Sequence, residues 1–204
     1  MAIEEPAFEV IEKAEAIEIR QYRPFIVAET FVEGEMDAAS GAGFRRIADY
    51  IFGNNRSVRD SGSEAREKIA MTAPVTLEPV ERPEKIAMTA PVTVEPQVGG
   101  GTGTQASRWR VHFVMPRQYT MATLPRPNNP QVTLREVPGK RYAALTFSGF
   151  AGEATVAEKT DALTAWLKAR DLRPVAAPQL ACYNPPWTLP FLRRNEILIE
   201  IPGP

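Results

Sequence analysis

Residues able to do chemistry are few in this chain of 204 residues. It has one histidine, His112, and one cysteine, Cys182, which lie in separate segments. This excludes the common zinc sites, which need several such ligands, and leaves His112 as the partner that any nucleophile would have to use. No catalytic triad or dinucleotide-binding fingerprint is present. We expect Cys182 to be a packed thiol, because a reactive thiolate needs a nearby cation or helix N-terminus.

The most polar cluster, Arg193 to Glu196, is attached to an apolar strand near the end of the chain. Its two arginines could bind the carboxylates of a ligand, or they could form a solvated turn. Glu196 could do acid–base chemistry if an apolar cavity raised its pKa. Its neighbours on the same strand face, Leu198 and Glu200, make that face amphipathic and favour a structural role.

Aromatic residues accompany a proline-rich stretch just before this cluster. Tyr183, Trp187 and Phe191 flank the prolines at positions 185, 186 and 190. Because proline fixes the backbone, we expect a rigid, extended loop here. Its aromatic rings could wall a pocket for a flat ligand or cap the open end of the fold.

Apolar residues at helical spacing predict two amphipathic helices, over about 37–52 and about 152–169. The inward residues are Phe44, Ile47, Ala48 and Ile51 in the first helix and Val156, Leu163, Trp166 and Leu167 in the second.

Alternating patterns predict strands over 108–115 and 195–201, among a total of about eight or nine. Trp109, Val111 and Phe113 share one face, so we expect His112 on the other, exposed to solvent or at a rim. Two helices with this many strands indicate an α+β domain.

A faint internal repeat appears when the sequence is shifted by 115 residues, which places Gly34 over Gly149 and Arg20 over Arg135. It predicts one domain over 1–204 with internal halves at about 6–96 and 108–201. Two polar or glycine-rich stretches, 53–66 and 97–107, are expected to be flexible loops. The second lacks the Lys-Ser/Thr of a phosphate-binding loop.

Composition narrows the class of protein further. The formal net charge is −1 and nothing suggests a basic face, so we expect no nucleic-acid partner. No apolar run reaches the ~20 residues of a membrane span, and the N-terminus does not resemble a secretory signal. We therefore expect a soluble, cytoplasmic protein and leave its oligomeric state open.

The chain also contains a thirteen-residue segment twice, at 67–79 and 84–96, with Leu77 in the first copy replaced by Val94 in the second. The alternation of each copy predicts a half-buried strand, with Met71 and Met88 pointing into apolar surroundings. The proline within each copy suggests a sheet edge or a bulge. Methionine in such positions fills cores and adaptable pockets, although its thioether can also bind a metal.

The repeated Ile-Ala-Met-Thr-Ala-Pro-Val closely resembles the signature of the SOUL haem-binding family. Further similar stretches follow in the family's order, so that the resemblance covers roughly residues 6–201. They are Phe8–Lys13, Ile17–Arg23, Phe44–Asn55, Phe113–Pro116, Phe147–Phe150, Tyr183–Trp187 and Arg193–Ile197. The resemblance implies a distorted antiparallel β-barrel with pseudo-two-fold symmetry and two flanking helices, similar to bacterial effector-binding domains of the gyrase-inhibitor type.

The resemblance also implies a function, the non-catalytic binding of haem, porphyrin or a related tetrapyrrole in a hydrophobic cleft. The residues that we expect to contact it are Met71, Met88, Tyr183, Trp187, Phe191, Arg193, Arg194 and Glu196. We expect His112 to be dispensable, with a role as axial iron ligand as the alternative. Two other functions stay open: a module that binds another apolar or cationic small molecule, and a hydrolase that uses Glu196.

Overall fold

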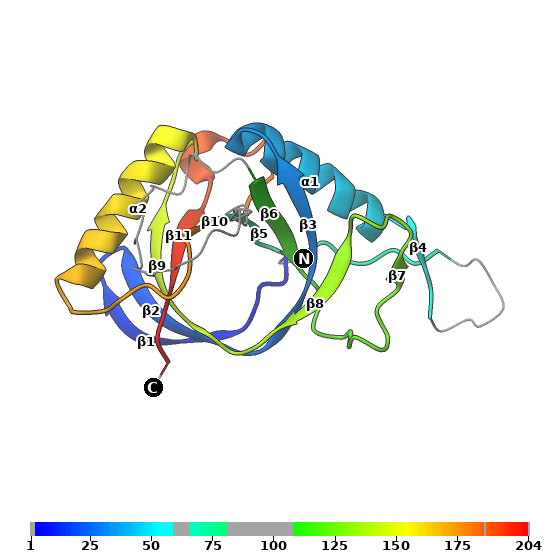
Figure 1. The fold of residues 1–204 in the computed structure, drawn as a ribbon, viewed down its shortest axis with the longest axis horizontal. Helices are drawn as coiled ribbons and strands as arrows, with labels where there is room; N and C mark the ends of the chain where they lie inside the picture. Colours follow the sequence, from blue (N-terminus) through cyan, green and yellow to red (C-terminus); the bar gives the residue numbers. More distant parts are fainter. Residues whose placement is uncertain (1–2, 59–65, 81–107, 186, 204) are drawn as a thin grey trace, which may run out of the picture.

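The structure is a computed structural model, and it describes residues 3–58, 66–80, 108–185 and 187–203. One curled, nine-stranded sheet carries two α-helices on its convex side (Figure 1). The elements in chain order are β1 (Phe8–Ala14), β2 (Ile17–Tyr22), β3 (Phe25–Glu33), α1 (Met36–Ile51), β4 (Asn55–Arg56), β5 (Val75–Pro79), β6 (Arg108–Val114), β7 (Arg126–Pro127), β8 (Thr133–Val137), β9 (Arg141–Phe147), α2 (Glu153–Lys168), β10 (Gln179–Cys182), the 3₁₀ turn η1 (Pro190–Leu192) and β11 (Asn195–Ile201). The predicted α+β class is confirmed, and the predicted distorted antiparallel barrel with two flanking helices takes the form of a curled half-barrel sheet.

The strand order in the sheet is β1-β2-β9-β11-β10-β5-β6-β3-β8. From the central pair β10 and β5 it proceeds symmetrically, through β11 and β6, then β9 and β3, then β2 and β8. Helix α1 packs on β3 and β6, and α2 packs on β9 and β11, so each helix covers one wing of the sheet.

The elements follow the 115-residue shift seen in the sequence. Under this shift β2 falls on β8, β3 on β9 and α1 on α2. Gly34 and Gly149 both have positive φ, 119° and 101°, a conformation that glycine adopts without strain. The equivalent order of elements supports a structural repeat, while the superposition of the two helices stays a prediction.

The main core lies between the sheet and the helices. Trp109, Val111 and Phe113 are buried in it, as their alternation predicts, and so are Ile197 and Ile199. The opposite, concave face of the sheet carries polar and aromatic side chains. The helices have nearly the predicted bounds, since their ends follow from local apolar spacing.

The first copy of the repeated segment differs from its prediction. Only Val75–Pro79 forms a strand, and it lies in the middle of the sheet and not at an edge. Residues 66–74 have no regular strand structure, and the Ala73–Pro74 peptide bond is cis. Strand alternation therefore does not apply to Met71, which is 38% exposed and does not point into the core as predicted. The second copy, with Met88, lies outside the described residues.

The stretch 53–66 also contains more structure than expected. Asn55–Arg56 forms strand β4, which pairs with β7. Asn55 is buried and its side-chain amide donates to the carbonyls of Tyr50 and Glu67, both at 2.8 Å. The predicted loop 97–107 lies outside the described residues. Across the part of the chain that is described, no helix has the length and apolar character needed to cross a membrane.

Candidate ligand-binding site

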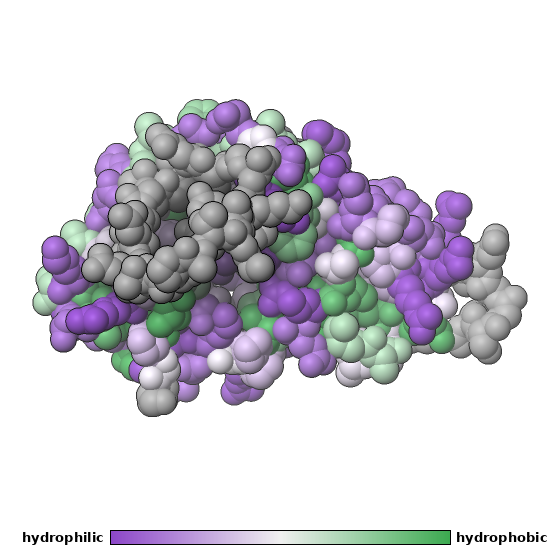
Figure 2. Space-filling model, in the orientation of Figure 1, coloured by the Kyte–Doolittle hydropathy of each residue, from purple (hydrophilic) through white to green (hydrophobic). Residues whose placement is uncertain are grey.

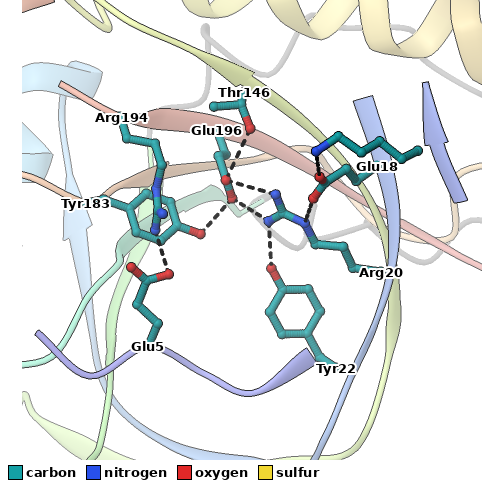
Figure 3. Close-up of polar contacts among 9 residues, drawn as sticks. Glu5, Glu18, Arg20, Tyr22, Thr146, Tyr183, Arg194 and Glu196 are labelled. Carbon is teal, nitrogen blue, oxygen red and sulfur yellow. Dashed lines mark hydrogen bonds and ion pairs between the residues drawn. The ribbon is translucent and has the colours of Figure 1, made fainter. Parts of the chain in front are cut away.

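A buried carboxylate, Glu196 on β11, is the centre of a polar network on the concave face (Figure 3). Its side chain is 2% exposed. Arg20 on β2 donates to both of its oxygens, at 2.8 and 3.0 Å. The hydroxyls of Tyr183 and Thr146 donate to it at 2.6 and 3.2 Å. These groups meet because β9 pairs with both β2 and β11, which brings the ends of the chain together.

The network extends towards the N-terminal segment. The Arg194 guanidinium stacks on the Tyr183 ring, 3.5 Å from its centroid, and pairs with Glu5 at 2.6 Å. Burial, together with the nearby Glu196 carboxylate, raises the pKa of Tyr183, so this phenol stays protonated and donates. Glu196 is therefore neutralised by Arg20 and supplied with four hydrogen bonds.

A cavity of about 100 Å³ lies on the same concave face. Its lining combines aromatic and apolar groups with ion pairs, namely Tyr22, Phe25, Tyr142, Val114 and Leu198 with Arg110, Glu78, Arg135, Lys140 and Glu200. The cations are all paired: Arg110 with Glu78 at 2.9 Å, Arg135 with Glu29 at 2.8 Å, and Lys140 with Glu200 at 2.6 Å.

His112 lines this cavity, which corrects the prediction that it is exposed. It does lie opposite Trp109 and Phe113, but this face forms the inside of the curled sheet, and the residue is 7% exposed. Its Nδ1 has no hydrogen-bond partner among the described residues. Burial, followed by the charges of Arg135 and Arg110, lowers the pKa of His112 from 6.5 to about 3, so the ring is neutral.

A second candidate surface is formed by two loops at one end of the sheet. We call it the loop patch, and its members are the exposed apolar residues Phe150, Trp187, Leu189, Phe191 and Leu192, whose exposed fractions range from 56% to 82%. The N–H of Gly149 donates to the carbonyl of Pro190 at 2.9 Å, which joins the loops. Figure 2 shows hydrophobic residues interspersed with hydrophilic ones along the top edge, where Figure 1 places the segment before β11.

Arg193 lies beside the loop patch. Its guanidinium lies 5.0 Å from the centroid of the Phe150 ring and donates to the carbonyl of Thr188 at 2.8 Å. The patch thus combines a broad apolar surface with an adjacent cation.

A third hollow, an open groove of about 530 Å³, lies beside β8. Phe25, Ile26, Met115, Tyr119 and Val137 contribute to its lining. Its volume is within the usual range of ligand pockets, and no pattern in the sequence pointed to it.

The predicted site residues fall into separate groups. Tyr183, Arg194 and Glu196 meet in the buried network, while Trp187 and Phe191 lie in the loop patch with Arg193 beside it. Met71 belongs to neither the network nor the patch.

The sequence reasoning missed Arg20, Tyr22 and Thr146. One signal was available for Arg20, since the 115-residue shift aligns it with Arg135, and both arginines form ion pairs with glutamates on the concave face.

This chain belongs to the SOUL haem-binding protein family, whose model matches residues 3–84 and 78–200. In this family member the fold is a curled sheet with two flanking helices and a polar concave face.

Solved structures share the fold at low sequence identity. The C-terminal domain of EcmrR matches with a TM-score of 0.60 and 10% identity, covering 92% of this chain and 98% of that domain. An uncharacterized conserved protein from Listeria innocua matches with a TM-score of 0.57 and 10% identity, covering 91% and 92%. A hydrolase from Listeria innocua matches with a TM-score of 0.54 and 12% identity, covering 94% of each chain. No curated protein sequence matches.

Proposed function

We propose that this protein binds haem or a related tetrapyrrole without catalysis, through the loop patch. The observation that carries the proposal is the exposure of five large apolar side chains on adjoining loops. Contiguous exposed apolar surface on a soluble domain usually marks a binding site. Membership of a haem-binding family supplies the class of ligand.

The residues of the loop patch suit a flat, apolar ligand that carries carboxylates. The rings of Trp187, Phe191 and Phe150 offer faces for a macrocycle, and Arg193 offers a guanidinium for a propionate. Bound haem would bring its own iron chemistry, while these side chains would hold the ring. His112 lies in the cavity of the concave face and is not part of the patch, so affinity would come from apolar burial at about 25 cal/mol per Å².

The concave cavity supports a second candidate, the binding of a small polar molecule. Its volume of about 100 Å³ is too small for a macrocycle. The unpaired Nδ1 of His112 favours this candidate, because a buried polar atom without a partner is costly.

A hydrolase that uses Glu196 receives no support from the geometry. A general acid or base needs an oxygen free to exchange a proton with substrate. Both oxygens of Glu196 already accept hydrogen bonds from Arg20, and Tyr183 and Thr146 add two more.

Titration with haemin, followed by the Soret absorbance, tests the proposal. We expect a Soret shift for the wild type and roughly tenfold weaker binding for Trp187→Ala or Phe191→Ala, because each substitution removes a large part of the apolar contact. Arg193→Glu should also weaken binding, through repulsion of the propionates.

Two variants serve as controls. Val175→Ala removes an exposed apolar side chain outside the loop patch and should leave binding unchanged. His112→Ala should also leave it unchanged in protein shown to be folded. Absence of a Soret shift in the wild type, or its loss in His112→Ala alone, would contradict the proposal.

A further inference from the structure

The first copy of the repeated segment, residues 67–79, is held by contacts that begin at its first residue. The N–H of Glu67 donates to Asn55 Oδ1 at 3.0 Å, and its carboxylate accepts from the Tyr119 hydroxyl at 2.8 Å. Ile69 is 3% exposed, and its N–H donates to the carbonyl of Ile51 at 2.9 Å. These contacts position the segment before the strand begins.

The rest of this copy forms the centre of the sheet. The Thr72 hydroxyl donates to the carbonyl of Val114. Strand β5 then pairs with β10 on one side and β6 on the other. Leu77 is buried in the main core and Glu78 accepts from Arg110 at 2.9 Å. We call the position that these contacts define the central slot.

The second copy, residues 84–96, lies outside the described residues, but its sequence carries the same side chains. Glu84, Ile86, Thr89 and Glu95 correspond to the four residues whose side chains contact the slot at positions 67, 69, 72 and 78. The one difference is Val94 in place of Leu77, which is one methylene smaller. The second copy can therefore make every side-chain contact of the first except part of one apolar contact.

The connections allow either copy to reach the slot. With the first copy in place, residues 57–66 precede it and residues 80–107 lead to β6. With the second copy in place, residues 57–83 would precede it, and residues 97–107, which contain four glycines, would close a hairpin to β6. One connection lengthens as the other shortens, and closure entropy changes slowly with loop length.

The match to the family model has two parts, and each part includes one copy of the repeated segment. Its two parts, residues 3–84 and 78–200, overlap between the two copies. Each part thus contains one complete copy of the signature segment.

We propose that the central slot accepts either copy, so that the protein exchanges between two arrangements of one sheet. The buried methylene of Leu77 favours the first copy by about fourfold, equivalent to about 0.8 kcal/mol. The exchange moves the longer connection from one side of the central strand to the other.

The native cysteine offers a direct test. Cys182 on β10 lies directly opposite Val75 on β5, both pack against the main core, and Cys182 is a free thiol. Opposite residues of antiparallel strands have the Cα separation that a disulfide needs. Val75→Cys should therefore cross-link to Cys182 when oxidised with copper–phenanthroline at low protein concentration.

Val92→Cys is the informative variant, because Val92 corresponds to Val75 in the second copy. We expect about one fifth of the chains to cross-link to Cys182 early, and more as exchange continues, as seen by mass spectrometry of monomeric protein. Val98→Cys, outside both copies, is the background control. The proposal is overturned if Val92→Cys stays at the Val98→Cys background while Val75→Cys is complete, or if it cross-links only between molecules.

Buried charge provides an independent measurement. Leu77→Asp should keep a cooperative unfolding transition, because the second copy replaces the damaged first copy. Val94→Asp should behave like the wild type, whereas the double variant Leu77→Asp/Val94→Asp should lose the transition. A Leu77→Asp protein that is as unfolded as the double variant would rule the exchange out.

Discussion

At the scale of single residues, Arg20 and Glu196 are 176 positions apart in the chain, yet they form a bidentate pair inside the sheet. The polar groups of both side chains have hydrogen-bond partners. The contribution of the pair to stability therefore depends on both residues being present. A buried charge that loses its partner destabilises a protein far more than the pair stabilises it.

We expect Glu196→Gln to lower the free energy of unfolding by about 2–4 kcal/mol, because it removes the bidentate, buried counter-ion of Arg20 and leaves only the Glu18 carboxylate, 2.8 Å from Arg20 Nε, to balance the charge. Urea unfolding measures this loss. Lys13→Met is the control, since it removes an exposed cation from Glu18, which keeps its pair with Arg20, and it should cost less than about 1 kcal/mol. Equal losses in the two variants would show that Glu196 does not balance a buried charge.

His112 should make stability depend on pH. Its pKa in the fold is about 3, whereas the unfolded chain has the ordinary value near 6.5. Between these values only the unfolded state binds the proton, so stability falls as the pH is lowered, by about 2.5 kcal/mol between pH 7 and 4.5. Charged groups facing His112 across the cavity, Glu29, Glu78, Arg110 and Arg135, remain in place in a His112→Gln variant.

Urea unfolding at pH 7 and 4.5 checks this expectation. The His112→Gln variant should lose about 2.5 kcal/mol less than the wild type over that interval. The same pH dependence in both proteins would mean that His112 is protonated in the folded state.

At the scale of elements, helix α1 lies against the sheet at Gly43. A Cβ atom added there would lie 2.4 Å from Val111 Cγ2 on β6, which is too close for any side chain. Gly41, one half-turn away, would meet only the flexible end of Arg45 at 3.4 Å. The packing of the helix on the sheet therefore requires glycine at position 43 but not at position 41.

We expect Gly43→Ala to destabilise the protein by about 1–3 kcal/mol through overpacking, and Gly41→Ala to stabilise it by about 0.5–1 kcal/mol through helix propensity. Thermal or urea unfolding of the two variants distinguishes them. If both substitutions stabilise the protein, α1 can move away from β6 without loss.

At the scale of the whole molecule, the two halves are interlocked. Strand β3 lies between β6 and β8, and β9 lies between β2 and β11. A cut within residues 97–107 would leave β3 in one fragment and both of its neighbours in the other.

We therefore expect each of the fragments 1–102 and 103–204 to be unfolded when it is alone. The mixture of the two should regain the native circular dichroism spectrum. The measurement is circular dichroism with urea unfolding of each fragment and of the mixture. Cooperative unfolding of either fragment alone would contradict the interlocked arrangement.

The sequence by itself determined the two helices, the strands β6 and β11, and the family. Apolar spacing is a local property, so it located α1, α2, β6 and β11 within about a residue. The alternation of apolar residues also placed Trp109 and Phe113 on the opposite strand face from His112. The repeat of elements was visible because equivalent positions, such as Gly34 and Gly149, need the same backbone conformation.

Only the tertiary structure decided what each face and each charge does. Alternation shows that His112 and Trp109 lie on opposite faces, but the curl of the sheet decides that the face of His112 is enclosed. Met71 precedes its strand and so escapes the alternation that predicted it buried. Arg20 meets Glu196 because strands from both ends of the chain pair with β9, and such pairing depends on the global topology, which local periodicity does not contain.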